Sequence, residues 1–270
     1  MKPLADKTAL VAGASRGAGR GIAYALGEAG ATVYVTGRSV RGAITDNRNE
    51  CIEETAQGVD ARGGRGVAIR CDHTDEEDVK ALFGRIAREQ THLDLLVNSA
   101  FGGSEDSLPA DEGPSFWQRS FSLWDAMMSA PKSCFLTSRY ALPLLFTSER
   151  ALIVNVTFFM RDKLLSDLYY DVAMNAVNRA TLGMAQELKA RHVAAIALCP
   201  GWMRTERVTD AGFGPADGAA ESTAYIGRAV AALAADPLAA RYTGCALTVA
   251  ELAEHYGFTD TDGTQPPAYE

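Results

Sequence analysis

The stretch VAGASRGAGRG, residues 11–21, decides the fold. It lies between a short apolar run, TALVAG (8–13), and an amphipathic segment, GRGIAYALGEAG (19–30), which is the order strand, tight turn, helix. Glycines in such a turn allow a tight bend and close approach of an anion, and the free amides at the helix start favour phosphate. We therefore predict a nucleotide-binding βαβ unit, with contacts from Gly13, Ser15, Arg16, Gly17 and Gly19.

Outward from this turn, short β-rich runs alternate with longer amphipathic segments along the chain. Near-continuous apolar strands separated by helices are typical of a parallel sheet with helices on both faces. No repeat or low-complexity linker divides the chain. We predict one doubly wound α/β domain over residues 1–270 with a seven-stranded parallel sheet, whose expected strands are 8–13, 31–37, 66–72, 93–100, 151–157, 193–200 and 245–250.

Composition limits the classes of partner. The 270 residues are 47% hydrophobic and carry a net charge of −8, which does not favour nucleic acid or an anionic membrane as a partner. The apolar run near the N-terminus is too short for a signal peptide, and no segment is long enough to span a bilayer. The five cysteines are scattered, and the four histidines show no metal-ligand spacing. We expect no metal, and a location in a reducing compartment, the cytoplasm.

The glycine turn also contains a G-x-S-x-G pattern, from Gly13 to Gly17, which is the nucleophile elbow of serine hydrolases. A hydrolase would need earlier strands, and an acid and a histidine at other strand ends. Here the pattern follows the first strand, and His192 and His255 lack that context. Because the additional Gly19 suits a phosphate-binding turn, we favour the nucleotide site.

The end of the second expected strand indicates which dinucleotide binds. An NAD site usually has an acid about twenty residues after the glycine turn, which binds the ribose hydroxyls. Here that position is Arg38, and Arg16 adds a second cation within the turn. Two guanidinium groups can hold a 2′-phosphate by charge-assisted hydrogen bonds, so the sequence predicts NADP(H). The alternative is that both arginines are solvated surface charges.

Two polar, Gly/Pro-rich stretches, residues 101–120 and 201–220, are long for connections in such a domain. Each follows an expected strand and therefore emerges at the carboxyl edge of the sheet, where open α/β folds bind ligands. We expect both stretches to form substrate loops.

The order of these motifs resembles that of the short-chain dehydrogenase/reductase family over nearly the whole chain. VAGASRGAG is followed by CDHTD, LLVNSA, IVNVT, YDVAM and CPGWMRT. The resemblance implies a Rossmann-type domain, hydride transfer between a nicotinamide and a carbonyl or alcohol carbon, and a homodimer or homotetramer. It implies that Asp72 contacts the adenine and that Asn98 steadies the central strands. Pro200 and Gly201 would border the nicotinamide, and Thr205 would touch the carboxamide or the diphosphate.

The family's proton-transfer residues are only partly present. By the resemblance a tyrosine transfers the proton, a serine polarises the carbonyl, and a lysine orients the ribose and lowers the tyrosine's pKa. Tyr170 matches the tyrosine, and its neighbour Tyr169 suits packing at the helix start. Thr157 keeps a hydroxyl at the serine position, whereas Phe158 in that register would leave no polariser. The lysine position, four residues after the tyrosine, is Met174.

The missing lysine affects the two directions of the reaction unequally. A free phenol has a pKa of about 10, so only about one in a thousand is ionised at neutral pH. Neutral Tyr170 can donate a proton in a reduction but is a poor base for an oxidation. The family's asparagine, which supports a water relay, falls at Ala130 or Pro131 and is missing as well. Met174 can also serve simply to fill an apolar gap between helix and sheet.

Several large apolar side chains flank the expected catalytic end. If they converge, they form a roomy apolar pocket suited to a bulky aromatic or polycyclic substrate. The alternative is that half of them belong to the core or to an interface. The residues are Phe101, Phe158 and Trp202, with Phe159, Met160, Met203 and Trp117.

These patterns predict an NADP(H)-dependent, carbonyl reductase-like oxidoreductase that acts on a bulky apolar substrate with a weakened catalytic site. Two other classes fit the same sequence. One is an enzyme that keeps the nucleotide for non-redox work such as cyclisation, isomerisation or elimination, and the other is a cofactor-binding protein without catalysis. Met174 could also be a single change in an otherwise active enzyme, but the missing asparagine argues against this.

Overall fold

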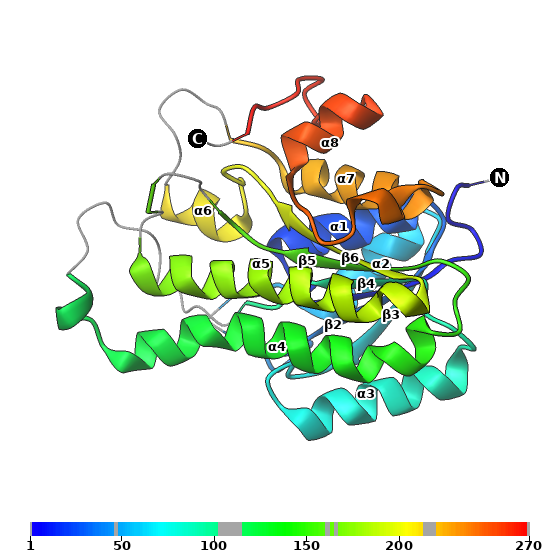
Figure 1. Cartoon of the computed structure of the whole chain (residues 1–270), viewed down its shortest axis with the longest axis horizontal. Helices are drawn as coiled ribbons and strands as arrows, with labels where there is room; N and C mark the ends of the chain where they lie inside the picture. Colours follow the sequence, from blue (N-terminus) through cyan, green and yellow to red (C-terminus); the bar gives the residue numbers. More distant parts are fainter. Residues whose placement is uncertain are drawn as a thin grey trace.

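The computed structural model of the chain describes residues 2–45, 48–101, 115–159, 163–164, 167–212 and 220–268. Seven strands form one parallel sheet in the order β3-β2-β1-β4-β5-β6-β7 (Figure 1). This confirms the predicted sheet. The strands are β1 Thr8–Ala12, β2 Thr32–Gly37, β3 Arg65–Arg70, β4 Leu95–Asn98, β5 Ala151–Val156, β6 Val193–Cys199 and β7 Ala246–Thr248.

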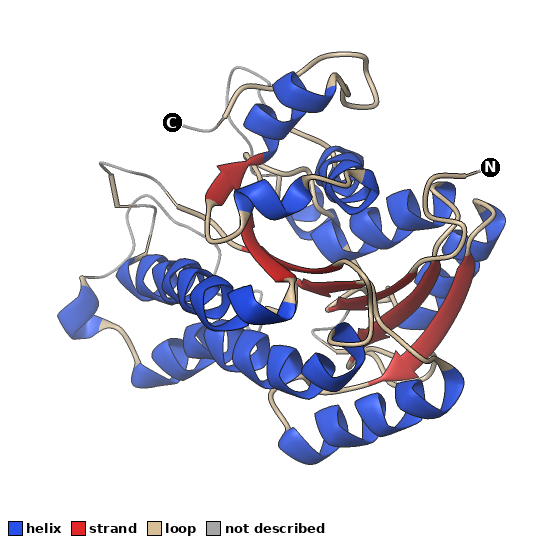
Figure 2. Ribbon diagram, turned by 45° about the vertical axis from the view of Figure 1, so that its right-hand side comes forward, coloured by secondary structure: helices blue, strands red, loops and turns tan. Residues whose placement is uncertain are grey.

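The helices cover both faces of the sheet, as the two layers around the strands in Figure 2 show. One face carries α1 Gly17–Glu28, α2 Ile52–Ala61, α7 Thr223–Ala235 and α8 Val249–Tyr256. The opposite face carries α3 Glu76–Glu89, α4 Phe121–Leu145 and α5 Leu168–Leu188. The short helix α6 Glu206–Ala211 follows β6, and the described residues also form the 3-10 turns η2 Phe116–Gln118, η3 Lys189–Arg191 and η4 Ala239–Tyr242.

Alternate residues of the central strands point into two separate cores. Along β1, Leu10 packs in the α3–α4–α5 core, and Val11 packs in the core under α1, α2 and α7. Both residues are fully buried. A strand buried on both faces reads as a continuous apolar run, which explains why the strands were visible in the sequence.

Helix caps determine where several of the helices and strands begin or end. Asp75 caps α3 by accepting hydrogen bonds from the backbone N–H groups of Glu77 and Asp78, at 2.9 and 3.0 Å, as its position predicts. The last strand is shorter than the expected 245–250, because Thr248 begins α8 with a capping box that involves Glu251. The described part of the chain contains no helix with the length and hydrophobicity of a membrane span.

Helices α1 and α7 lie with their backbones in contact through two glycines. A Cβ atom on Gly21 would lie 2.0 Å from the carbonyl oxygen of Thr223, and one on Gly227 would lie 2.5 Å from the carbonyl oxygen of Gly21. Neither position can take a side chain without moving a helix. This contact holds α1, and therefore the glycine turn before it, against the C-terminal part of the domain.

We predict that Gly21→Ala lowers the free energy of unfolding by about 3 kcal/mol, because the added methyl group meets backbone atoms that cannot yield. The matched control is Gly183→Ala in α5, where a Cβ would have no neighbour within 4 Å. This control should be neutral or should gain up to about 1 kcal/mol from helix propensity. Urea unfolding of both variants measures the difference, and equal midpoints would contradict the close contact.

Candidate active site

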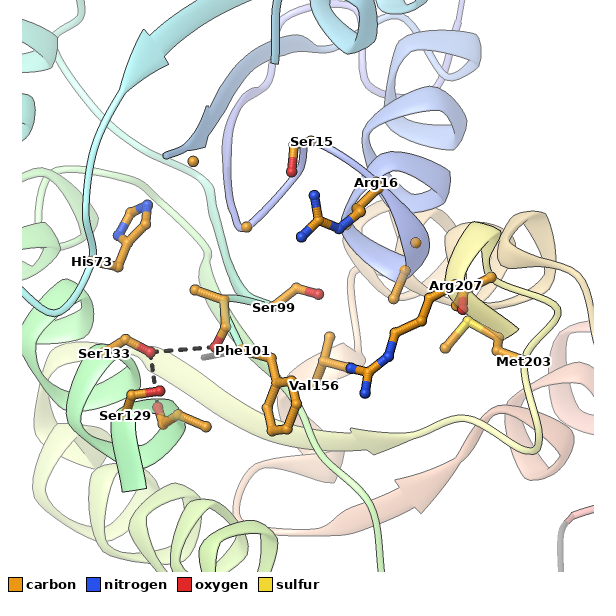
Figure 3. Close-up of a pocket in the computed structure, with 18 of the residues that line it drawn as sticks. Ser15, Arg16, His73, Ser99, Phe101, Ser129, Ser133, Val156, Met203 and Arg207 are labelled. Atoms are coloured by element: carbon orange, nitrogen blue, oxygen red, sulfur yellow. Dashed lines mark hydrogen bonds between the residues drawn. The ribbon is translucent and has the colours of Figure 1, made fainter. Parts of the chain in front are cut away.

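A cavity of about 610 Å³ opens at the carboxyl edge of the sheet, where the strand order reverses between β1 and β4. This is where ligands bind in open α/β folds. Figure 3 shows Ser15 and Arg16 from the glycine turn on one side, His73 on another, and Arg207 reaching in from α6. The cavity brings together most of the predicted site residues, namely Gly13, Ser15, Arg16, Gly17, Gly19, Arg38, Asp72, Phe101, Thr157, Phe158, Tyr170, Met174, Pro200, Gly201, Trp202 and Thr205.

The glycine turn has the conformation that its sequence predicts. Gly13 has a φ of 77°, and a Cβ there would lie 2.6 Å from the Cα of Ala100 at the end of β4. A Cβ on Gly19 would lie 2.2 Å from the carbonyl oxygen of Gly13. Glycine is therefore required at both positions, and the amides at the start of α1 face the cavity rather than a side chain of the turn.

One of these amides already donates a hydrogen bond to an acidic side chain. The backbone N–H of Gly17 donates to Oε2 of Glu206 at 2.8 Å, and Nη1 of Arg20 lies 3.8 Å from Oε1 of the same carboxylate. The start of α1 thus binds an anionic oxygen group in this structure, which is the chemistry needed for the pyrophosphate of a dinucleotide. The residues present fit such a cofactor. Nothing in the turn's own sequence pointed to Glu206.

Part of the cavity wall is formed by residues that follow β2 and β3. Arg38 comes directly after β2 and is exposed at the cavity wall. The carboxylate of Asp72 accepts hydrogen bonds from the N–H and the hydroxyl of Thr74, at 2.9 and 2.7 Å. His73, which the sequence did not single out, lies buried between the hydroxyls of Thr36 and Thr137, at 2.8 and 2.9 Å. Burial lowers the pKa of His73 to about 4, so its ring is neutral.

Asn98 is the one predicted cofactor-site residue that does not line the cavity. Its Nδ2 donates to Oδ1 of Asn155 at 2.8 Å and to Oγ of Ser138 at 3.0 Å, which ties the ends of β4 and β5 to α4. Asn155 in turn donates to Thr181 of α5 at 2.8 Å. These bonds link the ends of β4 and β5 to the two helices α4 and α5.

Tyr170 lies in the first turn of α5, positioned by the helix cap. The carboxylate of Asp167 accepts from the backbone N–H groups of Tyr169 and Tyr170, and Arg119 forms an ion pair with it. The Tyr170 ring meets that of Phe101 edge-on, with centroids 5.8 Å apart. Burial raises the pKa of Tyr170 above its ordinary value, so the phenol stays neutral. Tyr169 is a packing residue, as expected, because it is buried against Trp124.

Thr157 and Met174 line the cavity together with Tyr170. The Thr157 side chain is only 3% exposed, and its hydroxyl donates to the carbonyl oxygen of Met174 at 3.1 Å. To polarise a substrate, this hydroxyl would have to give up that bond. Met174 is buried in an apolar cluster with Phe158 and Cys199, so it fills the gap between α5 and the sheet.

Helix α4 presents small polar groups where the family has its asparagine. Of the two candidate positions, Ala130 lines the cavity and Pro131 does not. The hydroxyls that line this wall belong to Ser129 and Ser133, which the sequence reasoning did not find. Ser129 donates to the carbonyl oxygen of Ala126 at 2.6 Å, and Ser133 donates to that of Ala130 at 2.9 Å. Both hydroxyls are thus held by backbone acceptors.

The segment after β6 is fixed by a buried carboxyl group. Oε1 of Glu221 accepts from the backbone N–H of Gly201 at 2.9 Å, and the side chain of Glu221 is 2% exposed. Burial raises the pKa of Glu221 to about 8. At the end of the segment, the hydroxyl of Thr205 caps α6 by accepting from the N–H of Val208 at 3.2 Å. This bond leaves the donor side of the Thr205 hydroxyl for a ligand.

Only some of the predicted pocket residues line the cavity. Phe101, Phe158, Trp202 and Met203 line the cavity, but Phe159 does not. Trp117 was expected to overhang the site but does not line the cavity; it is 72% exposed and its ring meets that of Phe116 edge-on, with centroids 5.2 Å apart. Met160 and parts of the two expected substrate loops (102–114 and 213–219) lie outside the described residues.

Comparison with known proteins places this site among enzymes. The profile of the family described as "short chain dehydrogenase" matches residues 7–212. The mouse protein "Dehydrogenase/reductase SDR family member 1" is 34% identical over 97% of this chain and 86% of its own length. A 3beta-hydroxysteroid dehydrogenase of Mediterraneibacter gnavus is 32% identical over 72% of this chain and 65% of its own. A solved structure of a proposed dehydrogenase from Xanthomonas campestris superimposes with a TM-score of 0.81 and 25% identity, covering 98% of this chain and 96% of the other.

We predict that Glu206→Gln tightens dinucleotide binding by about 2- to 10-fold, because a neutral amide competes less well than a carboxylate for the amides at the start of α1. The dissociation constant is measured by titration calorimetry. The matched control is Glu54→Gln, which removes the other acid near Arg20, at 3.5 Å, without touching Gly17. Equal tightening in both variants would show a general charge effect and contradict the competition.

Proposed function

The chain belongs to the short-chain dehydrogenase/reductase family, and from this premise we propose that it is an NADP(H)-dependent reductase of bulky apolar carbonyl compounds. It is an oxidoreductase that uses a nicotinamide cofactor, as members of this family do. The observation that carries the proposal is the neutral phenol of Tyr170 at the wall of a largely apolar cavity that begins at an anion-binding glycine turn.

When bound, a reduced nicotinamide supplies the hydride that is added to the carbonyl carbon. The chain's own contribution is the proton. As the carbonyl π-bond opens, Tyr170 gives its O–H proton to the carbonyl oxygen, which yields the alcohol and leaves a phenolate that takes a proton from solvent. The buried phenol suits this direction, because it stays protonated until the substrate draws the proton away.

Two arginines support NADP(H) over NAD(H). Arg16 and Arg38 both line the adenosine side of the cavity, and the residue after β2 is a cation where an NAD site has an acid. A 2′-phosphate between them would accept fork-like, charge-assisted hydrogen bonds.

The cavity walls support a bulky apolar substrate. Phe101, Phe158 and Trp202 contribute aromatic surface to the catalytic end. The relative from Mediterraneibacter gnavus is named for a steroid, which is a substrate of this shape. We further propose that the protein works in the cytoplasm as a homodimer or homotetramer.

The catalytic site is weaker than that of the family pattern. Met174 provides no ammonium group to orient the ribose, and the Thr157 hydroxyl is held by a backbone carbonyl. Both features reduce orientation of the reacting groups, so we expect slow turnover. Neither removes the proton donor.

We predict measurable oxidation of NADPH by the wild type with 2-acetonaphthone and with a 3-ketosteroid, followed as loss of NADPH absorbance. Tyr170→Phe should lower kcat about 100-fold or more, because the proton donor is gone. Tyr169→Phe is the matched control and should keep its activity, since the Tyr169 hydroxyl donates to the carbonyl oxygen of Phe116 at 3.2 Å, away from the cavity. Met174→Lys should increase turnover.

The outcomes of this assay separate the competing classes. Turnover by the lysine variant alone would indicate a silenced redox site. Tight NADPH binding without turnover in either protein would refute the reductase and favour non-redox work or a binding function.

We also predict that Arg38→Gln weakens NADPH binding by about 10- to 100-fold, because a charge-assisted contact to the 2′-phosphate is lost. NADH binding should change less than about twofold in the same variant, since NADH has no such phosphate. Arg41→Gln is the matched control, because Arg41 is exposed, carries the same charge and does not line the cavity. Fluorescence titration with both nucleotides measures these constants, and a parallel loss for NADH would contradict the assignment.

A further inference from the structure

Arg207 is a charged residue at the catalytic end of the cavity to which no motif assigns a role. It is the second residue of α6, half-buried, and it lines the cavity together with Thr157, Tyr170 and Met174. Figure 3 shows its side chain running from α6 into the cavity, toward the side where Phe101 and Val156 lie. This direction carries the guanidinium away from the glycine turn.

The neighbours of Arg207 place its charge beside the proton donor. The ring of Phe101 meets the ring of Tyr170 edge-on, with centroids 5.8 Å apart, so the space into which Arg207 points borders the phenol. Val156 is the last residue of β5 and immediately precedes Thr157. The guanidinium of Arg207 therefore lines the same cavity as the phenol of Tyr170 and the hydroxyl of Thr157.

The electrostatics agree with this placement. Burial raises the pKa of Tyr170, and the nearby Cys199 and Asp171 raise it further, whereas Arg207 is the group that lowers it. A cation near a phenol favours the phenolate, and the effect is stronger in a cavity with apolar walls than in water. In the family pattern a lysine four residues after the tyrosine supplies this effect, and Met174 removes it.

We propose that Arg207 is the cation that acts on Tyr170 during proton transfer, in place of the lysine that Met174 replaces. Arg207 comes from α6 and not from α5, so a cation still lines the cavity with Tyr170 although a different helix supplies it. As the Tyr170 proton moves to the carbonyl oxygen, Arg207 stabilises the phenolate left behind. This role rests on the proposed function, because it requires Tyr170 to be the proton donor.

The test uses tetranitromethane, which nitrates the phenolate form of tyrosine and needs no substrate or cofactor. Nitration of each tyrosine is followed by peptide mass spectrometry at several pH values in the full-length protein. Because one pKa unit changes the phenolate fraction about tenfold, Arg207→Gln should slow nitration of Tyr170 by about that factor. Arg207→Lys should retain the wild-type rate. Tyr242, which does not line the cavity, is the internal control and should not change.

Two further variants separate charge from packing. Adding Met174→Lys to Arg207→Gln should restore the nitration rate, since the cation then comes from α5. Arg204→Gln is the matched control from the same segment, because Arg204 faces Asp260 at 3.8 Å and does not line the cavity. An unchanged Tyr170 rate in Arg207→Gln, or a slow rate that Met174→Lys fails to restore, overturns the proposal.

Kinetics then connect the charge to the reaction. With NADPH and 2-acetonaphthone, Arg207→Gln should lower kcat about tenfold while the dissociation constant of NADPH stays within about twofold. If only the dissociation constant of NADPH changes, Arg207 is a residue that binds the cofactor. If activity is lost only with carboxylated ketones, Arg207 binds the anionic group of the substrate. Either result overturns the proposal. If no ketone is turned over but nitration responds as expected, the reductase function fails while the action of Arg207 on Tyr170 stands.

Discussion

The site depends on how closely the chain passes itself at its first turn. Gly13 lies against the backbone at Ala100, and Gly19 lies against the carbonyl oxygen of Gly13, at distances that leave no room for a Cβ atom. The turn is therefore closed on itself and pressed onto the end of β4. As a result, the first amides of α1 face the crevice between β1 and β4, and the cavity forms where the strand order reverses. The other residues that line the cavity lie around these amides.

Much of this arrangement could be predicted from sequence because its causes are local. Doubly buried strands read as apolar runs, and a turn that excludes side chains reads as glycines. The directions of side chains in the segment after β6 have no such local cause. Glu206 and Arg207 stand side by side in an ordinary polar stretch, and only the fold shows that one reaches Gly17 and the other the catalytic end. The bond from the Thr157 hydroxyl to the Met174 carbonyl is also invisible in the sequence, because it joins β5 to α5.

The departures from the family pattern all favour the neutral form of the Tyr170 phenol. Met174 is buried with Phe158 and Cys199, so the environment of Tyr170 is more apolar than a lysine would make it. Burial and the missing ammonium both favour the neutral phenol. A neutral phenol is the form that donates a proton, which serves reduction, whereas oxidation needs a phenolate as base. These features agree with the proposed reductase, in which the proposed action of Arg207 would stabilise the phenolate as it forms.

Glu206 and Arg207 are consecutive residues whose side chains reach different ends of the cavity. Glu206 holds the start of α6 to the amide of Gly17, and Arg207 follows it in the same helical turn. A pyrophosphate bound at that amide would compete with the carboxylate for the same N–H group. Any movement of the α6 backbone that releases Glu206 also moves Arg207, and with it the charge near Tyr170. Displacement of Glu206 by the pyrophosphate would therefore change the position of the Arg207 charge relative to Tyr170. Cofactor binding at the glycine turn would then alter the pKa of the proton donor through two consecutive residues.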